Sequence, residues 1–131
     1  MDLYQQFETD ETAEAEGVWV TIGIGARLKI ARAGNPKHAA AIKRLSAPHI
    51  RPGMRMADIP DDVFSTITKE AVAESILVDW EGITRNGVPV PYSKAEALAA
   101  CGLKDFYNLV LTTSQSIEHY RKARIQELEK N

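Results

Sequence analysis

Apolar and polar residues alternate in two short runs near the N-terminus. The runs cover residues 18–22 and 26–30, and Gly23-Ile24-Gly25 separates them. A period of two is typical of strands with one buried face, and glycine tolerates the positive φ that a tight turn needs. The pattern predicts a β-hairpin, with Trp19 on the opposite face from Val18 and its apolar neighbours.

The middle of the chain has helical spacing on both sides of a proline-rich connector. Asn35-Pro36 predicts a helix start, because asparagine caps helices and proline suits the first helical position. We expect that helix to end near Ser46 and a second one to run from Asp58 or Asp61 to about residues 79–82. The connector, residues 47–60, contains three prolines and one glycine and is predicted to be irregular.

The C-terminal half predicts a tight turn and two further helices. Asn86-Gly87 is the favoured pair of a two-residue hairpin turn. Ser93-Lys94-Ala95-Glu96 is a capping box, so a short helix should follow and end at Gly102. Steps of three and four residues predict a last helix over about residues 104–129, with Tyr120 in its apolar seam and a charged end that extends into solvent or toward a partner.

Together these elements predict a mainly α domain with a small N-terminal β-hairpin (α+β). We expect a compact helical domain with about four helices over residues 17–131, since 131 residues suit one domain. Residues 1–16 carry six acidic side chains, no basic one and no sustained apolar period. This composition predicts a flexible acidic arm.

Charge is strongly segregated, although the net charge is only -2. Residues 17–57 hold eight lysines and arginines and no acidic residue. Such a region could bind phosphates, dock the acidic arm of its own or a neighbouring subunit, or meet an acidic protein. The segment lacks the aromatic residues that stack on bases, which favours a protein partner over nucleic acid. The predicted interaction surface is Trp19, Arg27, Lys29, Arg32, Lys43, Arg44, Arg51, Arg55, Tyr120 and Arg124.

The candidate chemistry is sparse. His38, His49 and His119 lie far apart in the sequence, and Cys101 has no second cysteine to pair with. We therefore expect a buried thiol at Cys101, no catalytic residue, no metal ligand and no cofactor, which argues against an enzyme. The single cysteine and the absence of an apolar leader predict a cytoplasmic protein, and no apolar run approaches the roughly 20 residues of a membrane span.

Four motifs, in order along the chain, carry a resemblance to a known family. They are Glu16-Gly17-Val18-Trp19-Val20, Gly34-Asn35-Pro36-Lys37, Asp79-Trp80-Glu81-Gly82-Ile83 and Asn86-Gly87-Val88-Pro89-Val90. With Asp105-Phe106 and the closing helix, they make about residues 14–125 resemble the tail assembly chaperones of long-tailed (siphovirus-type) bacteriophages.

The resemblance implies a non-catalytic morphogenesis factor of a phage or prophage. Such a chaperone binds the tape measure protein, keeps it soluble and promotes polymerisation of the tail tube protein around it. It also implies a homo-oligomer in the host bacterial cytoplasm, absent from the mature virion, with a possible frameshift-extended form of the same chain. Two alternatives stay open: a small nucleic-acid-binding regulator that uses the basic segment 27–55, and a structural head–tail component of the virion.

Overall fold

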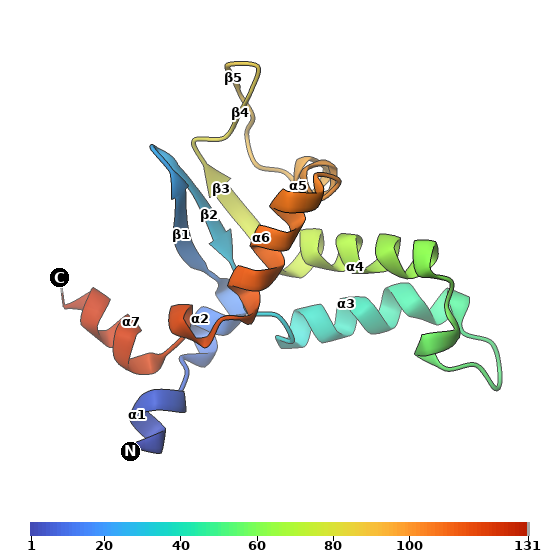
Figure 1. The fold of residues 1–131 in the computed structure, drawn as a ribbon, viewed down its shortest axis with the longest axis horizontal. Helices are drawn as coiled ribbons and strands as arrows, with labels where there is room; N and C mark the ends of the chain where they lie inside the picture. The colour runs from blue at the N-terminus through green and yellow to red at the C-terminus, as the bar shows by residue number, and fades with distance from the viewer. Residues whose placement is uncertain (131) are drawn as a thin grey trace.

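A three-stranded antiparallel sheet lies at the centre of the computed structural model, which describes residues 1–130. β1 (Val18–Gly23) and β2 (Ala26–Ile30) confirm the predicted hairpin, and β3 (Leu77–Glu81) pairs with the other side of β2 (Figure 1). Leu28 of β2 lies opposite Val20 on one side and Trp80 on the other. Leu28 is fully buried, so the face of the sheet that carries Leu28 packs against the core.

Helices α3 (Pro36–Ser46) and α4 (Asp61–Ser75) form a hairpin that projects away from the sheet (Figure 1). As predicted, Asn35 caps α3: its side-chain oxygen accepts a hydrogen bond from the His38 backbone N–H at 3.0 Å. Its side-chain amide also donates to the Ser75 carbonyl at 3.2 Å, which ties the start of α3 to the end of α4. The connector between the helices contains two single 3₁₀ turns, η1 (Ala47–His49) and η2 (Met56–Asp58).

Two more helices complete the core. Between the central sheet and α5 (Lys94–Ala100), the short strands β4 (Thr84–Arg85) and β5 (Val88–Pro89) form the predicted small hairpin. Ser93 caps α5 as expected, and α6 (Lys104–Gln115) follows. One buried cluster joins the sheet to α4, α5 and α6: Leu28, Ile30, Val72, Ala73, Ile76, Leu77, Trp80, Ala97, Cys101 and Val110.

The predicted fold class, a mainly helical domain with about four helices and one N-terminal hairpin, is wrong. Residues 1–130 contain seven α-helices, and the strands lie in two sheets spread along the chain. One cause lies in residues 76–81, where the helical spacing of α4 continues in the sequence but the chain forms β3. As a strand, this segment supplies hydrogen-bond partners for the backbone groups of β2 on the side away from β1. Leu77 and Trp80 are buried in this arrangement.

The prediction of one long last helix is also wrong, because the structure divides this segment into two helices. α6 ends at Gln115, a 3₁₀ turn (η3, Ile117–His119) follows, and α7 (Lys122–Glu129) begins a new helix. Ser116 is extended, with φ -82° and ψ 121°. The break turns Tyr120 into the core, where it is fully buried and its hydroxyl donates to the Ile30 carbonyl at 2.9 Å.

The N-terminal segment packs against the same C-terminal region. It forms α1 (Leu3–Phe7) and α2 (Glu11–Glu16), and α1 lies on the same side of the molecule as α7 (Figure 1). The Asp10 backbone N–H donates to the Tyr120 carbonyl, and the Lys122 N–H donates to the Glu8 carbonyl, both at 2.9 Å. The structure thus shows a docked position for this segment, and its predicted flexibility stays a prediction.

Candidate interaction groove

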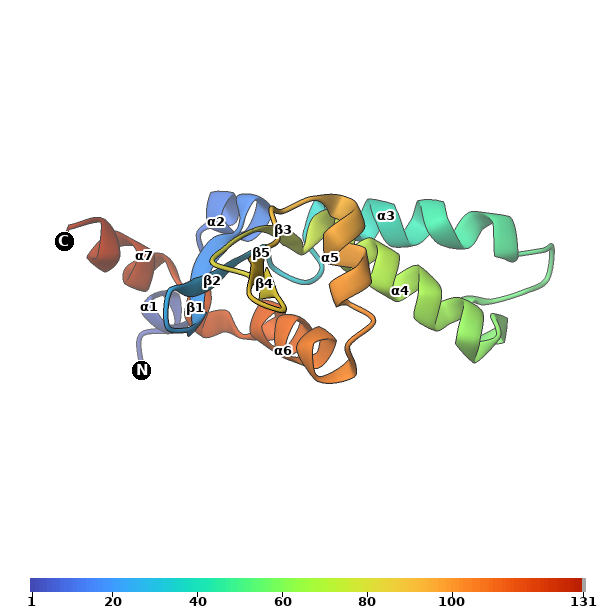
Figure 2. The same cartoon turned by 90° about the horizontal axis from the view of Figure 1, so that it is seen from above.

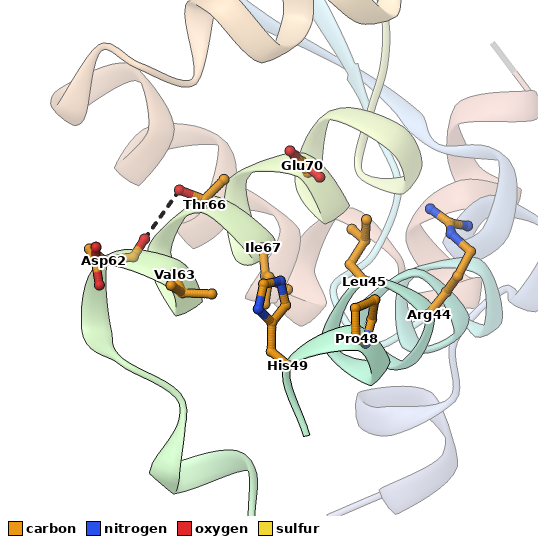
Figure 3. A pocket seen from close by; sticks show the side chains of 9 residues that line it. All are labelled: Arg44, Leu45, Pro48, His49, Asp62, Val63, Thr66, Ile67 and Glu70. Carbon is orange, nitrogen blue, oxygen red and sulfur yellow. Dashed lines mark hydrogen bonds between the residues drawn. The ribbon is translucent and has the colours of Figure 1, made fainter. Parts of the chain in front are cut away.

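An open groove of about 510 Å³ lies between α3 and α4. The two helices diverge toward their connector, as Figure 2 shows, and near the sheet the Asn35 side chain ties the start of α3 to the end of α4. Arg44, Leu45, Pro48 and His49 line one side of this α3–α4 groove, and Asp62, Val63, Thr66, Ile67 and Glu70 line the other (Figure 3).

The floor of the α3–α4 groove is apolar. Val63 and Ile67 are four residues apart on α4, so they share the face that looks toward α3. Leu45 reaches the groove from α3, and Pro48 follows from η1. Ile67 is nearly buried at 4% exposure, whereas Leu45 and Val63 are only half-buried. Apolar surface therefore remains open to a partner at the divergent end.

The rim of the α3–α4 groove is polar and charged. Arg44 places one guanidinium nitrogen 2.6 and 2.7 Å from the two carboxylate oxygens of Glu74, across the two helices. This ion pair joins the helices beside the groove. Asp62 and Glu70 add two carboxylates on the α4 side, so the rim carries more negative than positive charge. An apolar floor with a charged rim is the surface that accepts the apolar ridge of an amphipathic helix.

Trp19, Arg27 and Lys29 are predicted interaction residues that the structure does bring together. They lie on β1 and β2, on the face of the sheet opposite Leu28. The Arg27 guanidinium lies 4.1 Å from the centroid of the Trp19 ring, and the Lys29 ammonium lies 5.9 Å from it. The indole is half-buried beneath these cations, so it is not a free aromatic surface.

The basic segment is not an unopposed positive region. Half of its eight cations have acidic partners. In one of these pairs, the hydrogen bond between Arg27 and Glu81 raises the pKa of the Arg27 guanidinium and lowers the pKa of the Glu81 carboxyl. Within the described chain, Lys37, Lys43 and Arg51 are exposed and form no ion pair. The four pairs are Arg27 with Glu81 (2.7 Å), Arg32 with Glu14 (2.8 Å), Arg44 with Glu74 (2.6 Å) and Arg55 with Asp58 (3.8 Å).

The remaining predicted surface residues lie near the C-terminus. Tyr120 presents no surface, because it is fully buried and desolvation strongly raises the pKa of its hydroxyl. Arg124 is exposed on α7 and donates to the Glu118 carbonyl at 3.2 Å. Arg32 lies 5.7 Å from the Tyr120 ring and contacts Glu14, so it holds the N-terminal segment in place within one chain.

Sequence reasoning missed most of the groove. Leu45, Val63 and Ile67 have the spacing of a helix face that packs in a core, and the sequence does not show that the two helices diverge. Arg44 was among the predicted interaction residues because of its charge alone. The proline in the connector directly after α3 is the one local signal of a widened end, since it interrupts the regular packing of the helix pair.

Cys101 confirms the expectation of a buried thiol. The side chain is fully buried in the core, and desolvation raises its pKa to about 11. The thiol therefore stays protonated at neutral pH, where it is a poor nucleophile. Among the residues that the structure describes, no three His, Cys, Asp or Glu side chains are placed to hold a metal ion. In that same part of the chain, no helix is both long and apolar enough to cross a membrane.

Comparison with known proteins gives one family. The profile of the YdaY prophage protein family matches residues 33–131, which is well over half of the chain and includes both helices of the groove. No curated protein and no solved structure matches the chain.

Proposed function

The chain belongs to the YdaY prophage protein family, and we propose that it is a non-catalytic tail assembly chaperone. In this role it binds the tape measure protein of its prophage in the host cytoplasm and keeps it soluble. It promotes polymerisation of the tail tube protein around that client and then leaves. The phage origin comes from the family, and the chaperone role is supported by the resemblance of about residues 14–125 to phage tail assembly chaperones.

The α3–α4 groove is the observation that carries the proposal. A tape measure protein is long and helical, so its chaperone must cover apolar helix faces that would otherwise aggregate. Leu45, Val63 and Ile67 offer an apolar floor between two helices that project from the core. A client helix that lies along the groove would place its apolar ridge on this floor, as in other helix-in-groove complexes.

The charges around the groove would set the orientation of the client. Arg44 is already neutralised by Glu74, whereas Asp62 and Glu70 form no ion pair with any described residue. These two carboxylates leave the rim negative on the α4 side. We therefore expect the bound helix to carry basic residues next to its apolar ridge, since complementary charge steers association and fixes register.

Co-expression with the tape measure protein of the same prophage tests the proposal. The native chain should hold the client in the soluble fraction and co-elute with it. Thr66→Arg, at an exposed position of the groove, should abolish both effects by filling the groove with a long charged side chain. Val63→Asp should do the same by placing a charge on the apolar floor.

The matched control is Ile24→Arg at the fully exposed tip of the β1–β2 turn, which leaves the groove untouched. It should solubilise the client as well as the native chain does. An insoluble client in the presence of the native chain would contradict the proposal. So would full activity in both groove variants.

Purified phage particles separate this role from that of a structural component. A chaperone should be absent from mature virions by mass spectrometry, although it is abundant in the lysate of an induced culture. Recovery of the chain in the virion in a fixed ratio to the tail tube protein would favour a structural head–tail component instead.

A further inference from the structure

The outer edge of β1 is an open strand edge. β1 pairs with β2 on one side, and β3 lies beyond β2, so the other side of β1 is the margin of the sheet. In Figure 1 no segment runs beside the upper part of β1 on the side away from β2. Within residues 1–130, no backbone hydrogen bond reaches the outward-facing N–H and C=O groups of residues 18–23.

The sequence of this edge lacks most of the usual protection against pairing. Natural edge strands carry a charge, a proline or a bulge that prevents another strand from adding to them. β1 reads Val-Trp-Val-Thr-Ile-Gly, with no charged residue and no proline. Its one irregularity lies between Thr21 and Gly23, at the turn end, and leaves residues 18–21 in regular register.

We propose that β1 pairs with β1 of a second copy of this chain, in antiparallel orientation, to form a continuous six-stranded sheet. This inference does not depend on the proposed chaperone function. A twofold axis near Val20 makes the two edges self-complementary, because each strand then presents the same groups to the other. Both copies keep Val18 and Val20 on the face that carries Leu28 and Ile30, so the apolar face continues across the junction.

The charges of the sheet permit this approach of two copies. The cations nearest the edge lie on β2, where Lys29 is opposite Asp79 and Arg27 forms an ion pair with Glu81. β1 itself adds no charge, so two edges meet without like-charge repulsion. The partner that this edge fits is therefore another uncharged, β-branched strand in antiparallel register, and the chain carries one such strand in β1.

Light scattering after size-exclusion chromatography gives the first test. The native chain should have twice the monomer mass at micromolar concentration. Ile22→Lys and Thr21→Lys, both at exposed positions of β1, should each give the monomer mass, because a lysine on an edge strand opposes the addition of a second strand. Ile24→Lys, at the turn beyond the strand, should remain a dimer. Circular dichroism establishes that each variant is folded.

A cross-link supplies the second test. In Thr21→Cys the new thiol is exposed, whereas native Cys101 is fully buried. A short bis-maleimide should join two copies through position 21, and it should form no covalent link between two copies of Leu103→Cys, an exposed position before α6, as denaturing electrophoresis shows. A monomeric native chain would overturn the proposal and leave the edge to an extended segment of a different protein. Lysine variants that stay dimeric, or equal cross-linking at both positions, would overturn it as well.

Discussion

The Tyr120 hydroxyl donates a 2.9 Å hydrogen bond to the Ile30 carbonyl, although the two residues are 90 positions apart. Both side chains are fully buried. This bond joins the end of β2 to the break between α6 and α7, and the Asp10 backbone donates to the Tyr120 carbonyl from the other side. Tyr120 therefore holds the central sheet, the C-terminal segment and the N-terminal segment together.

Removal of the Tyr120 hydroxyl should weaken this junction. Tyr120→Phe keeps the ring but leaves the Ile30 carbonyl without this donor, so it should lower the free energy of unfolding by about 1–2 kcal/mol. Tyr120→Ala also creates a cavity and should cost about 3–5 kcal/mol. Urea denaturation followed by circular dichroism measures both values. Equal stability of Tyr120→Phe and the native chain would contradict the role of the hydrogen bond.

Asn35 should matter more to stability than an ordinary helix cap. Its oxygen caps α3, and its amide donates to the carbonyls of Arg32 and Ser75. Asn35→Ala should therefore cost about 2–3 kcal/mol, since it removes the amide donor to the Ser75 carbonyl as well as the cap, while the Arg32 carbonyl keeps the Asn35 backbone N–H. Ser93→Ala is the matched control, because Ser93 only caps α5, and it should cost about 1 kcal/mol. Equal losses in thermal or urea unfolding would mean that the link to α4 contributes little.

Gly82 should tolerate no side chain. It has φ +72°, and a Cβ there would lie 1.8 Å from the Gly25 carbonyl oxygen at the β1–β2 turn. Gly82→Ala should cost about 3 kcal/mol or more, because the end of β3 must move away from that turn. Gly34 has φ +85° but no atom within 4 Å of its added Cβ, so Gly34→Ala should cost only about 1 kcal/mol. Similar losses for the two variants would contradict the close approach.

Alkaline pH should destabilise the chain through Cys101. Burial raises the pKa of this thiol from 9.0 to about 11, so the folded state favours the protonated form. The stabilising effect is complete below about pH 9 and is lost as the pH rises from there toward 11, a loss on the order of 2 kcal/mol. Urea titrations at several pH values should show this slope in the native chain and a smaller one in Cys101→Ala. The same slope in both would assign it to other groups, such as Tyr92 and Tyr120, whose pKa values burial also raises.

The features that the sequence predicted correctly depend on neighbouring residues. Asn35-Pro36 starts α3, Ser93 caps α5, and Asn86-Gly87 forms its turn with φ values of 52° and 79°. β3 and the break before Tyr120 depend instead on partners far along the chain. Residues 77–81 form a strand that pairs its backbone with β2. The last helix is interrupted where Tyr120 enters the core and its hydroxyl donates to the Ile30 carbonyl.

The candidate site shows the same division. The eight cations of the basic segment were correctly seen as a cluster in sequence, but their partners Glu14, Glu74 and Glu81 lie in other elements. Counting the charges within the basic segment alone therefore overestimated its positive surface. The α3–α4 groove has no charge signature, because its floor residues obey the same helical spacing as a core. Its existence follows from the angle between two helices, which tertiary packing sets.

Amide hydrogen exchange on the chain alone and in complex with the co-expressed tape measure protein tests the central claim most directly. The account predicts that a complex forms and that the client slows exchange in residues 44–49 and 62–70, on both sides of the α3–α4 groove. The β4–β5 hairpin, outside the groove, should exchange at the same rate in both samples. Failure to form a complex, or protection confined to surfaces outside these two ranges, would contradict the account.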